Sequence, residues 1–193
     1  RFGKSAIAFI GNKNRKSLEI TYPQMLEMLS RDQKQIFAIE NKDSGIGKEL
    51  IKHIQLQELG KNVYALNNKV DILNWLDKNP DGIGIIDWCE ISDSDDPSSK
   101  EFLNKVSLIG ITPKEGSNEF VKPYQYNLNG LYPFTRDLYF IRKEALNDAS
   151  LGFASFICED RGQKILLKAG LLPEYQTERW IEFKGLKDVK VVE

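Results

Sequence analysis

Short apolar runs alternate along the chain with segments in which apolar residues recur every three or four positions. The short runs have the length of β-strands, and the other segments have the period of amphipathic α-helices. Strand-helix-strand alternation with short connections favours an α/β fold with a largely parallel sheet and helices on its faces. The predicted strands cover residues 6–10, 35–39, 63–66, 82–86, 106–111 and 138–141.

Three helices are predicted between the early strands, each with a recognisable start. The side chains of Ser, Thr and Asn accept hydrogen bonds from the free N–H groups of a first helical turn, and proline suits that turn because its φ is already helical. The start and stop signals are Thr21 with Pro23 for the first helix, Ser44 for the second, and Asn68 with the turn 79–82 for the third, over 69–78.

The C-terminal half contains two further amphipathic segments, around residues 153–157 and 165–169. Gly170 and Pro173 stop the second of them. Polar and small residues at 91–100, and a loop-rich passage at 112–129, predict surface loops.

Composition and charge exclude several classes of partner. The chain has 193 residues, of which 41% are apolar, enough for a hydrophobic core. Its 27 basic and 28 acidic residues give a net charge of −1, so it has no excess of positive charge for nucleic acid or an anionic membrane surface. Apolar runs such as 83–86 are far shorter than the roughly 20 residues that span a bilayer.

Candidate metal ligands are sparse. One histidine and two cysteines cannot supply a zinc site built from clustered His and Cys. Cys89 and Cys158 are either two buried thiols, which we favour, or one disulfide. Asp93, Asp95 and Asp96 suggest calcium, but the glycine and glutamate positions of an EF-hand loop do not follow them, so a solvated acidic loop is the better interpretation. We therefore expect no metal and no cofactor.

Catalytic patterns are equally weak. His53 lies within a predicted helix, where we expect it to be partly exposed, and the sequence contains no G-x-S-x-G nucleophile motif. No spacing singles out a pair of carboxylates for acid-base chemistry, so the chain is not expected to be an enzyme. Aromatic residues in and near a strand favour a role in the core. They are Tyr132, Phe134, Tyr139 and Phe140, around Arg136.

Residues 40–47, Glu-Asn-Lys-Asp-Ser-Gly-Ile-Gly, leave a predicted strand and open a predicted helix. The free N–H groups of a first helical turn, together with the helix dipole, attract anions. Ser44 offers a hydroxyl, and Gly45 and Gly47 let the backbone approach a ligand closely. The alternative is an ordinary strand-turn-helix connection in which Ser44 only caps the helix.

Four stretches together resemble the phosphate-binding family of periplasmic solute-binding proteins, the receptors of phosphate ABC transporters. Tyr-Pro-Phe-Thr-Arg-Asp-Leu-Tyr at 132–139 is similar to the family's Tyr-Pro-Leu-Ser-Arg-Pro-Leu-Tyr strand. The others are 79–86, 168–173 and Asp43-Ser44-Gly45-Ile46, which falls where the family has its Gly-Ser-Gly-Thr phosphate loop. Their order and spacing agree with the family over nearly the whole chain.

The resemblance implies a periplasmic-binding-protein-like (type II) Venus-flytrap fold of two α/β lobes, the first of them incomplete in this chain. Residues 12–112 are expected to form lobe II, which carries the anion loop. Residues 1–11 and 113–193 are expected to form the crossover strands and the C-terminal part of lobe I. The family's first strands would precede Arg1. An incomplete lobe exposes apolar faces, so self-association of this fragment is also expected.

The implied function is capture of phosphate or a related oxyanion between the lobes and delivery to ABC permease subunits. This implies a periplasmic or extracytoplasmic location, for which a lipid anchor on a preceding N-terminal segment is one option. The implied ligand-binding residues are Ser44, Gly45, Ile46, Gly47 and Lys42, with Ile46 contributing only its N–H group. Arg136 is expected to brace the lobe, and a role at the cleft is the alternative.

Two positions depart from the family: Glu40 replaces an arginine and Ile46 a threonine. Lys42, expected on the same strand face as Glu40, either pairs with it or supplies the missing positive charge. Because Glu40 repels a dianion, the alternative function is a binding-fold protein that does not transport, a sensory or protein-interaction module.

Overall fold

The computed structural model describes residues 1–30, 34–114, 118–141 and 148–175 of the chain. Its main sheet has the strand order β4-β3-β5-β1-β6. These strands are β1 (Gly3–Asn12), β3 (Phe37–Ile39), β4 (Val63–Ala65), β5 (Ile83–Asp87) and β6 (Val106–Leu108).

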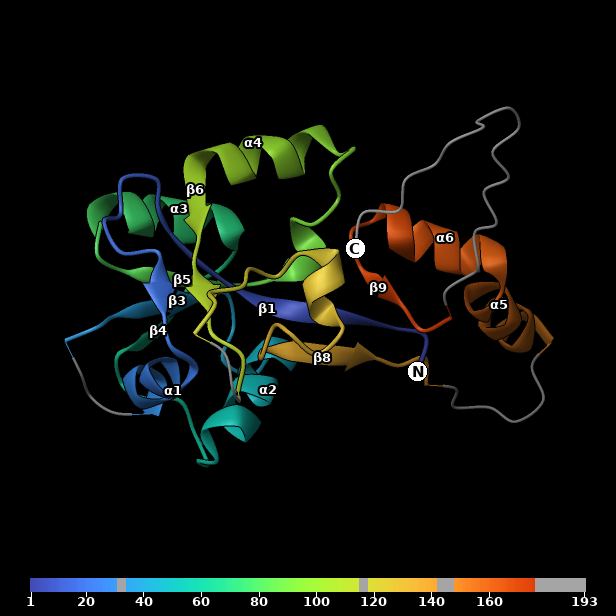
Figure 1. Cartoon of the computed structure of the whole chain (residues 1–193), viewed down its shortest axis with the longest axis horizontal. Coiled ribbons are helices and arrows are strands. Elements are labelled where there is room, and N and C mark those ends of the chain that lie inside the picture. Colours follow the sequence, from blue (N-terminus) through green and yellow to red (C-terminus); the bar gives the residue numbers. More distant parts are fainter. Residues whose placement is uncertain (31–33, 115–117, 142–147, 176–193) are drawn as a thin grey trace, which may run out of the picture.

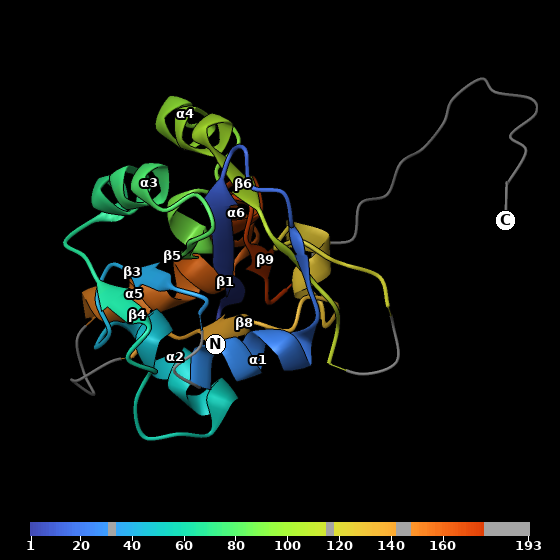
Figure 2. The ribbon, with the colours of Figure 1, turned by 90° about the vertical axis from the view of Figure 1, so that its left-hand side faces the viewer.

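Helices cover both faces of this sheet, as the alternating sequence pattern predicts. Helices α1 and α2 lie on one face and helices α3 and α4 on the other (Figures 1 and 2). The predicted starts of the first three are confirmed; for example, the Asn68 side chain accepts a 2.9 Å hydrogen bond from the N–H of Asp71. The four helices are α1 (Tyr22–Ser30), α2 (Gly45–Ile54), α3 (Lys69–Lys78) and α4 (Pro97–Lys105).

The expectation of a largely parallel sheet needs one correction. Strand β3 runs parallel to β4 and β5, but β1 is antiparallel to both of its neighbours in the main sheet, β5 and β6. Strands β5 and β6 therefore point the same way, and β1 lies between them in the opposite direction. Alternation along the sequence predicts the direction of strands joined by a crossover helix, but it cannot show that an earlier strand is inserted between two of them.

Strand β1 is shared between two groups of strands. Ile7–Asn12 pairs with β5 and β6, whereas Gly3–Ala6 pairs with β8 (Thr135–Leu138) and, at its first two residues, with β9 (Leu172–Pro173). The change of partners falls between Ala6 and Ile7. There the buried Tyr132 donates its hydroxyl hydrogen to the carbonyl of Ile7 over 2.8 Å.

Two predicted strands differ from the structure. The strand predicted at 138–141 is wrong in position: β8 covers Thr135–Leu138, and its last residue pairs with Gly3, the first residue of β1. The strand predicted at 106–111 is broken at Ile109. Its second part, β7 (Gly110–Ile111), pairs with β2 (Glu19–Ile20) in a separate two-stranded sheet.

The two predicted loops contain helical turns. Residues 91–100 include the start of α4, where Asp96 accepts hydrogen bonds from the N–H groups of Ser98 and Ser99, and Pro97 begins the helix. A sequence rich in Asp and Ser suits a helix cap as well as a loop, which explains the error. A short 3-10 turn, Gln125–Leu128, lies within 112–129, of which 115–117 lie outside the described residues.

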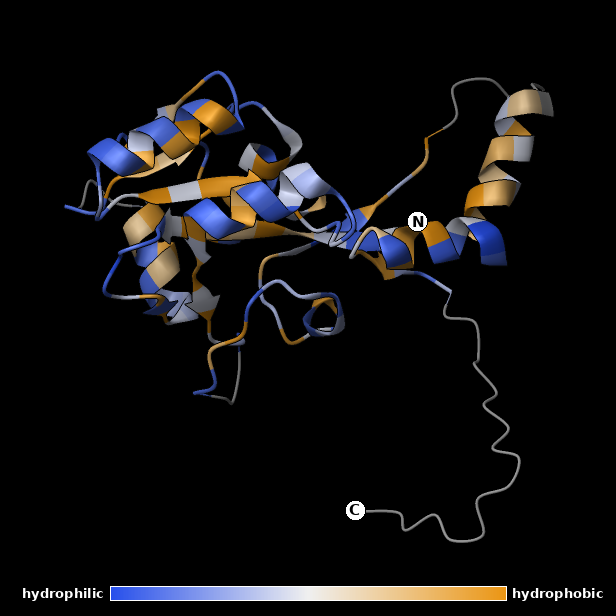
Figure 3. Cartoon of the chain, turned by 90° about the horizontal axis from the view of Figure 1, so that it is seen from above, coloured by the Kyte–Doolittle hydropathy of each residue, from blue (hydrophilic) through white to orange (hydrophobic). Residues whose placement is uncertain are grey.

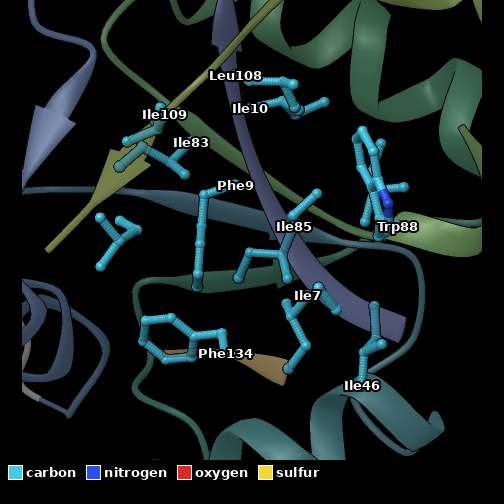
Figure 4. Close-up of a cluster of buried hydrophobic side chains, with 14 of the residues drawn as sticks. Ile7, Phe9, Ile10, Ile46, Ile83, Ile85, Trp88, Leu108, Ile109 and Phe134 are labelled. Carbon is cyan, nitrogen blue, oxygen red and sulfur yellow. The ribbon is translucent and has the colours of Figure 1, made fainter. Parts of the chain in front are cut away.

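The core lies where β1 crosses β5, with Phe9 at its centre (Figure 4). The ring of Phe9 packs edge-on against that of Phe134, with 4.9 Å between their centroids. The predicted core role of the aromatic cluster is confirmed for Tyr132 and Phe134, which are buried. It is wrong for Tyr139 and Phe140, which are exposed because they follow the end of β8.

The two C-terminal helices, α5 (Asp148–Cys158) and α6 (Asp160–Lys168), lie beside the N-terminal end of β1 (Figure 1). Gly170 ends the α6 segment with a φ of +75°, as its position in the sequence predicts. Its carbonyl accepts a 3.2 Å hydrogen bond from the indole of Trp88, and the Ser92 hydroxyl donates to the carbonyl of Ala169 over 2.6 Å. These bonds fix the end of α6 to the segment after β5.

The expectation of buried thiols is wrong, and so is the alternative of a disulfide. Cys89 and Cys158 are both free and exposed. Cys89 lies in the short 3-10 turn Trp88–Glu90 that follows β5, and Cys158 is the last residue of α5.

Candidate functional site

The N-terminus of α2 lies directly after β3, at the edge of the sheet where the parallel strands β3 and β5 end. Ser44 is its N-cap: the side-chain oxygen accepts a 3.2 Å hydrogen bond from the N–H of Gly47, and its carbonyl accepts from Lys48. In the described chain, no protein acceptor is bonded to the N–H groups of Gly45 and Ile46. These two donors, at the positive end of a helix dipole, form an anion-attracting surface.

Gly47 and Ile46 have structural reasons to occupy their positions. A Cβ on Gly47 would lie 2.0 Å from the carbonyl oxygen of Lys42, so the turn closes only around a glycine. The Ile46 side chain is buried in the core near Ile7 (Figure 4). The close approach that the sequence predicts at Gly47 is therefore made by the chain's own backbone.

Arg136 comes to the same place from a distant part of the sequence. A Cβ on Gly45 would lie 3.0 Å from Arg136 Nη1, so the guanidinium lies against the first turn of α2. Arg136 Nη2 lies 2.6 Å from Asp87 Oδ2 at the end of β5. Among the described residues, Arg136 Nε is buried and has no hydrogen-bond partner. The expected bracing role of Arg136 is thus combined with a position at the anion loop.

Asp87 is held in place by two further donors. Its Oδ1 accepts a buried hydrogen bond from the Ser5 hydroxyl at 3.1 Å and a second one from the backbone N–H of Cys89 at 3.2 Å. A carboxylate fixed by hydrogen bonds in a partly dehydrated place orients the guanidinium that it pairs with. Asp87 therefore positions Arg136 and also neutralises part of its charge.

More carboxylates surround this pair. Burial raises the pKa of Glu90, and the negative charge of Glu40 raises it further, whereas Lys69 lowers it. Although the Cys89 residue is exposed, desolvation of its thiol by the surrounding protein raises the pKa of that thiol to about 12, with Asp87 as the next cause. The thiol therefore stays protonated at neutral pH. The site thus combines one guanidinium and two free N–H groups with nearby acidic groups.

Contrary to the prediction from the sequence, Lys42 and Glu40 do not lie on one face of a strand. Strand β3 ends at Ile39, so both residues lie in the connection to α2, where the alternation of a strand does not apply. Within the described ranges, Lys42 and Glu40 form no ion pair, and both are half-buried.

The other sequence candidates have roles of their own. His53 is half-buried, as expected, with its ring 4.9 Å from that of Phe134. In the acidic loop, Asp96 caps α4 and Asp95 pairs with Lys168 at 3.3 Å. The portion of the chain described here holds no group of three or more His, Cys, Asp or Glu residues arranged for a metal ion.

A surface hollow of about 440 Å³ lies elsewhere, beyond the other end of α2. Its lining is Ser30 and residues 56–61. A helix C-terminus presents carbonyl oxygens and a negative dipole end, so this hollow does not suit an anion. We place the candidate site at the α2 N-terminus because the chemistry, and not the size of the hollow, points there.

Sequence reasoning missed Asp87 and Ser5, and it favoured a bracing role for Arg136 over a role at the cleft. The position of Asp87, directly after an apolar strand, was a usable signal, because ligands of parallel sheets bind beyond the carboxyl ends of strands. Nothing in the sequence near Ser5 or Arg136 indicates that they meet Asp87, since the contacts depend on the pairing of β1 with β8.

A search of solved structures shows which fold this is. The chain is similar to a protein from Clostridium perfringens described as a phosphate ABC transporter substrate-binding protein, with bound phosphate (TM-score 0.66, 19% identity, 90% of this chain and 70% of that one). It is also similar to a Planctomyces limnophilus protein described as phosphate-binding (TM-score 0.61, 12% identity, 89% of this chain and 65% of that one). A third similar structure is an ABC-type phosphate transport receptor from Vibrio cholerae (TM-score 0.57, 14% identity, 88% of this chain and 70% of that one).

These similarities establish a periplasmic-binding-protein fold, of which this chain is a part; it spans about two thirds of the length of those proteins. Scans of family models and of curated protein sequences give no match. Among the described residues, no helix has the length and apolar character needed to cross a membrane.

Proposed function

We propose that this chain is the solute-binding component of an ABC transporter and that it captures phosphate or a related oxyanion. The observation that carries the proposal is the position of Arg136 against the first turn of α2, beside the unbonded N–H groups of Gly45 and Ile46. The fold agrees, because the similar structures are solute-binding proteins, one of them with bound phosphate.

The two-lobe division is part of this proposal. Residues 12–112 form the lobe with the anion loop; residues 1–11 and 113–193 provide the crossover strands and part of a second, incomplete lobe. The change of partners along β1, from β8 and β9 to β5 and β6, supports a crossover at this point. The α2 N-terminus and Arg136 then face the space between the lobes.

In the proposed binding step no bond is broken. Gly45 and Ile46 donate their N–H groups to the anion, Ser44 donates its hydroxyl hydrogen while its oxygen still caps the helix, and Arg136 donates from Nη1. The half-buried Lys42 adds positive charge nearby, and Gly47 shapes the turn. Closure of the second lobe removes water, which strengthens each of these hydrogen bonds.

Glu40 gives the proposed site a preference among anions. A carboxylate near the anion repels a fully ionised ligand but accepts a hydrogen bond from one that retains a proton. Phosphate retains a proton at neutral pH and sulfate does not. The proposed site therefore favours phosphate in its protonated forms over sulfate.

The experiment is a calorimetric titration of phosphate and then sulfate into the chain at pH 7 and pH 5.5. We expect saturable phosphate binding that sulfate does not displace. Arg136→Gln should weaken binding at least tenfold, whereas the matched control Lys105→Gln, which removes a remote cation from α4, should leave it unchanged. Absence of phosphate heat in a chain that is folded by circular dichroism would overturn phosphate as the ligand.

A second candidate function follows from the acidic groups. Asp87 offsets the charge of Arg136, and Glu40 and Glu90 lie close to each other, which favours a module that has lost anion binding and serves in sensing or protein interaction. Periplasmic location, a lipid anchor and permease partners belong to the transport proposal alone. If the gene for this chain lies beside genes for permease and ATPase subunits, transport is favoured. If it does not, the second candidate is favoured.

A further inference from the structure

Strand β6 is the outer strand of the main sheet, and a hollow of about 230 Å³ lies beside it. In the described chain, β6 pairs on one side only, with β1. All three residues of β6 line the hollow, although the side chains of neighbouring residues in a strand point to opposite faces of the sheet. The hollow therefore runs along the outer edge of the strand. Its other lining residues are Lys13, Leu18, Leu103, Lys122 and Tyr124.

The backbone of Leu108 points toward this outer edge. The N–H of Ile109 donates a 2.9 Å hydrogen bond to the carbonyl of Phe9 on β1. In an antiparallel ladder, hydrogen-bonded pairs alternate with pairs whose N–H and C=O groups point away from the partner strand. Leu108 and Ile10 form the next pair, so both backbone groups of Leu108 point away from β1. Among the described residues, none forms a hydrogen bond with these two groups.

The two free backbone groups of Leu108 need a partner of a particular kind. Leu108 is only 8% exposed, and the backbone groups of buried residues are nearly always hydrogen-bonded. One residue here offers both a donor and an acceptor, and the backbone of another extended chain offers the same two groups in return. A small carboxylate has only acceptors and would leave the C=O of Leu108 unpaired. The geometry therefore favours an added strand over a small anion.

The charges around the hollow favour an acidic partner. None of its eight lining residues is acidic, and two of them are lysines. Within the described ranges, neither the exposed Lys13 nor the half-buried Lys122 forms an ion pair. The backbone of Lys122 is held in place, because its carbonyl accepts hydrogen bonds from the N–H of Tyr124 at 2.7 Å and the side chain of Asn127 at 2.9 Å. Two unpaired cations in such a place attract negative charge.

The lining also offers apolar contacts. Leu18 and Leu103 are both half-buried. Leu103 belongs to α4, which carries hydrophilic as well as hydrophobic residues (Figure 3). The ring of Tyr124 is fixed edge-on against that of Trp88, with 6.0 Å between their centroids. Because the side chains of a strand alternate between two faces, an added strand can present both acidic and apolar groups to this lining.

We propose that an extended, acidic segment of a partner protein adds to the main sheet as a strand beside β6. Its backbone accepts from the N–H of Leu108 and donates to the C=O of the same residue, and its carboxylates pair with Lys13 and Lys122. The added strand is short, because beyond Leu108 the outer side is occupied by Leu18, whose carbonyl accepts from the N–H of Gly110 at 2.8 Å.

This contact is independent of the incomplete lobe and of the proposed anion site. Six of the eight lining residues belong to the segment 12–112, which we assign to the lobe with the anion loop. The anion site lies at the N-terminus of α2, and none of its residues lines the hollow. Loss of phosphate binding would therefore leave the strand proposal standing.

The test is a titration of the 193-residue chain with the peptide acetyl-Glu-Val-Glu-Val-Glu-amide, followed by NMR of the backbone amides. We expect a dissociation constant below about 1 mM. Exchange of the Leu108 amide hydrogen with solvent deuterium should slow at least tenfold when the peptide is bound. The amides of Ser107 and Ile109 face β1 and serve as internal controls, because their protection should hardly change.

Variants of the two lysines test the charge. Lys13→Gln and Lys122→Gln should each weaken peptide binding at least threefold, and the double variant at least tenfold. The matched control Lys61→Gln removes an exposed cation beside the other hollow and should leave binding unchanged. The neutral peptide acetyl-Gln-Val-Gln-Val-Gln-amide should bind at least tenfold more weakly than the acidic one.

Three results would overturn the proposal. The first is the absence of binding at peptide concentrations up to about 2 mM, well above the expected dissociation constant. The second is binding that leaves the Leu108 amide unprotected or that the double lysine variant does not weaken. The third is complete displacement of the peptide by acetate at the same carboxylate concentration, which would make the occupant a small anion.

Discussion

Arg136 on β8 and Asp87 at the end of β5 form an ion pair, with Nη2 and Oδ2 2.6 Å apart and both side chains mostly buried. The pair links β8 to the end of β5 in the main sheet, immediately beside the first turn of α2. It therefore affects both the stability of the chain and the charge available to an anion.

Replacing Asp87 by Asn separates these two effects. The loss of the negative charge leaves a guanidinium with little water around it, so we expect the free energy of unfolding to fall by about 2 kcal/mol. The same change frees Arg136 for an anion, so phosphate should bind more tightly. Urea denaturation and calorimetry measure the two quantities.

Asp137→Asn is the matched control for that prediction. It breaks the exposed pair between Arg1 and Asp137 and should cost less than about 1 kcal/mol. Equal losses of stability in the two variants would contradict the structural role of the Arg136–Asp87 pair.

Variants of Ser44 distinguish a helix cap from an anion ligand. Ser44→Ala removes the acceptor for the Gly47 N–H and should lower the free energy of unfolding by about 1 kcal/mol. Ser44→Asp retains a capping oxygen and should restore that stability, but its charge should repel an anion. Phosphate binding that survives Ser44→Asp would count against the proposed site.

The same substitution, glycine to alanine, should have opposite effects on stability at Gly47 and at Gly152. Gly47→Ala should destabilise the chain by about 3 kcal/mol, because the new Cβ would lie 2.0 Å from the Lys42 carbonyl oxygen. Gly152→Ala introduces a Cβ into open space within a helix and should stabilise it by about 0.5–1 kcal/mol. Thermal unfolding measures both, and a harmless Gly47→Ala would show that the turn differs from the one described.

His53 provides a test of pH dependence, because it is the only histidine in the chain. Burial against Phe134 lowers its pKa below the usual 6.5, and the positive charge of Lys114 lowers it further. The folded chain therefore binds this proton less readily than the unfolded chain, so the contribution of His53 to stability is complete above pH 6.5 and is lost as the pH falls toward the folded-state pKa.

A proton NMR titration yields the His53 pKa directly from one resonance. His53→Gln should remove the fall in the free energy of unfolding between pH 6.5 and the folded-state pKa. A measured pKa at or above 6.5 would contradict the packing of His53 between Tyr22 and Phe134.

Local features of the fold could be predicted because their causes are local. Asn68 caps α3 and Ser44 caps α2 through hydrogen bonds to residues three positions away, so a short stretch of sequence contains both partners. The start of α4 was missed although Asp96 and Pro97 give the same kind of signal, because the acidic run around them equally suits a loop.

The candidate site also has a part with local causes and a part with distant ones. The sequence by itself determined the Ser44 cap, the free N–H groups that follow it, and the glycine that the turn at Lys42 requires, since all of these lie within a few residues of one another. Only the tertiary structure decided that Arg136, Asp87 and Ser5 meet there, and that β1 lies antiparallel between β5 and β6. Each of these depends on which distant strands pair, and pairing is set by the packing of the whole core around Phe9, which no local pattern of residues specifies.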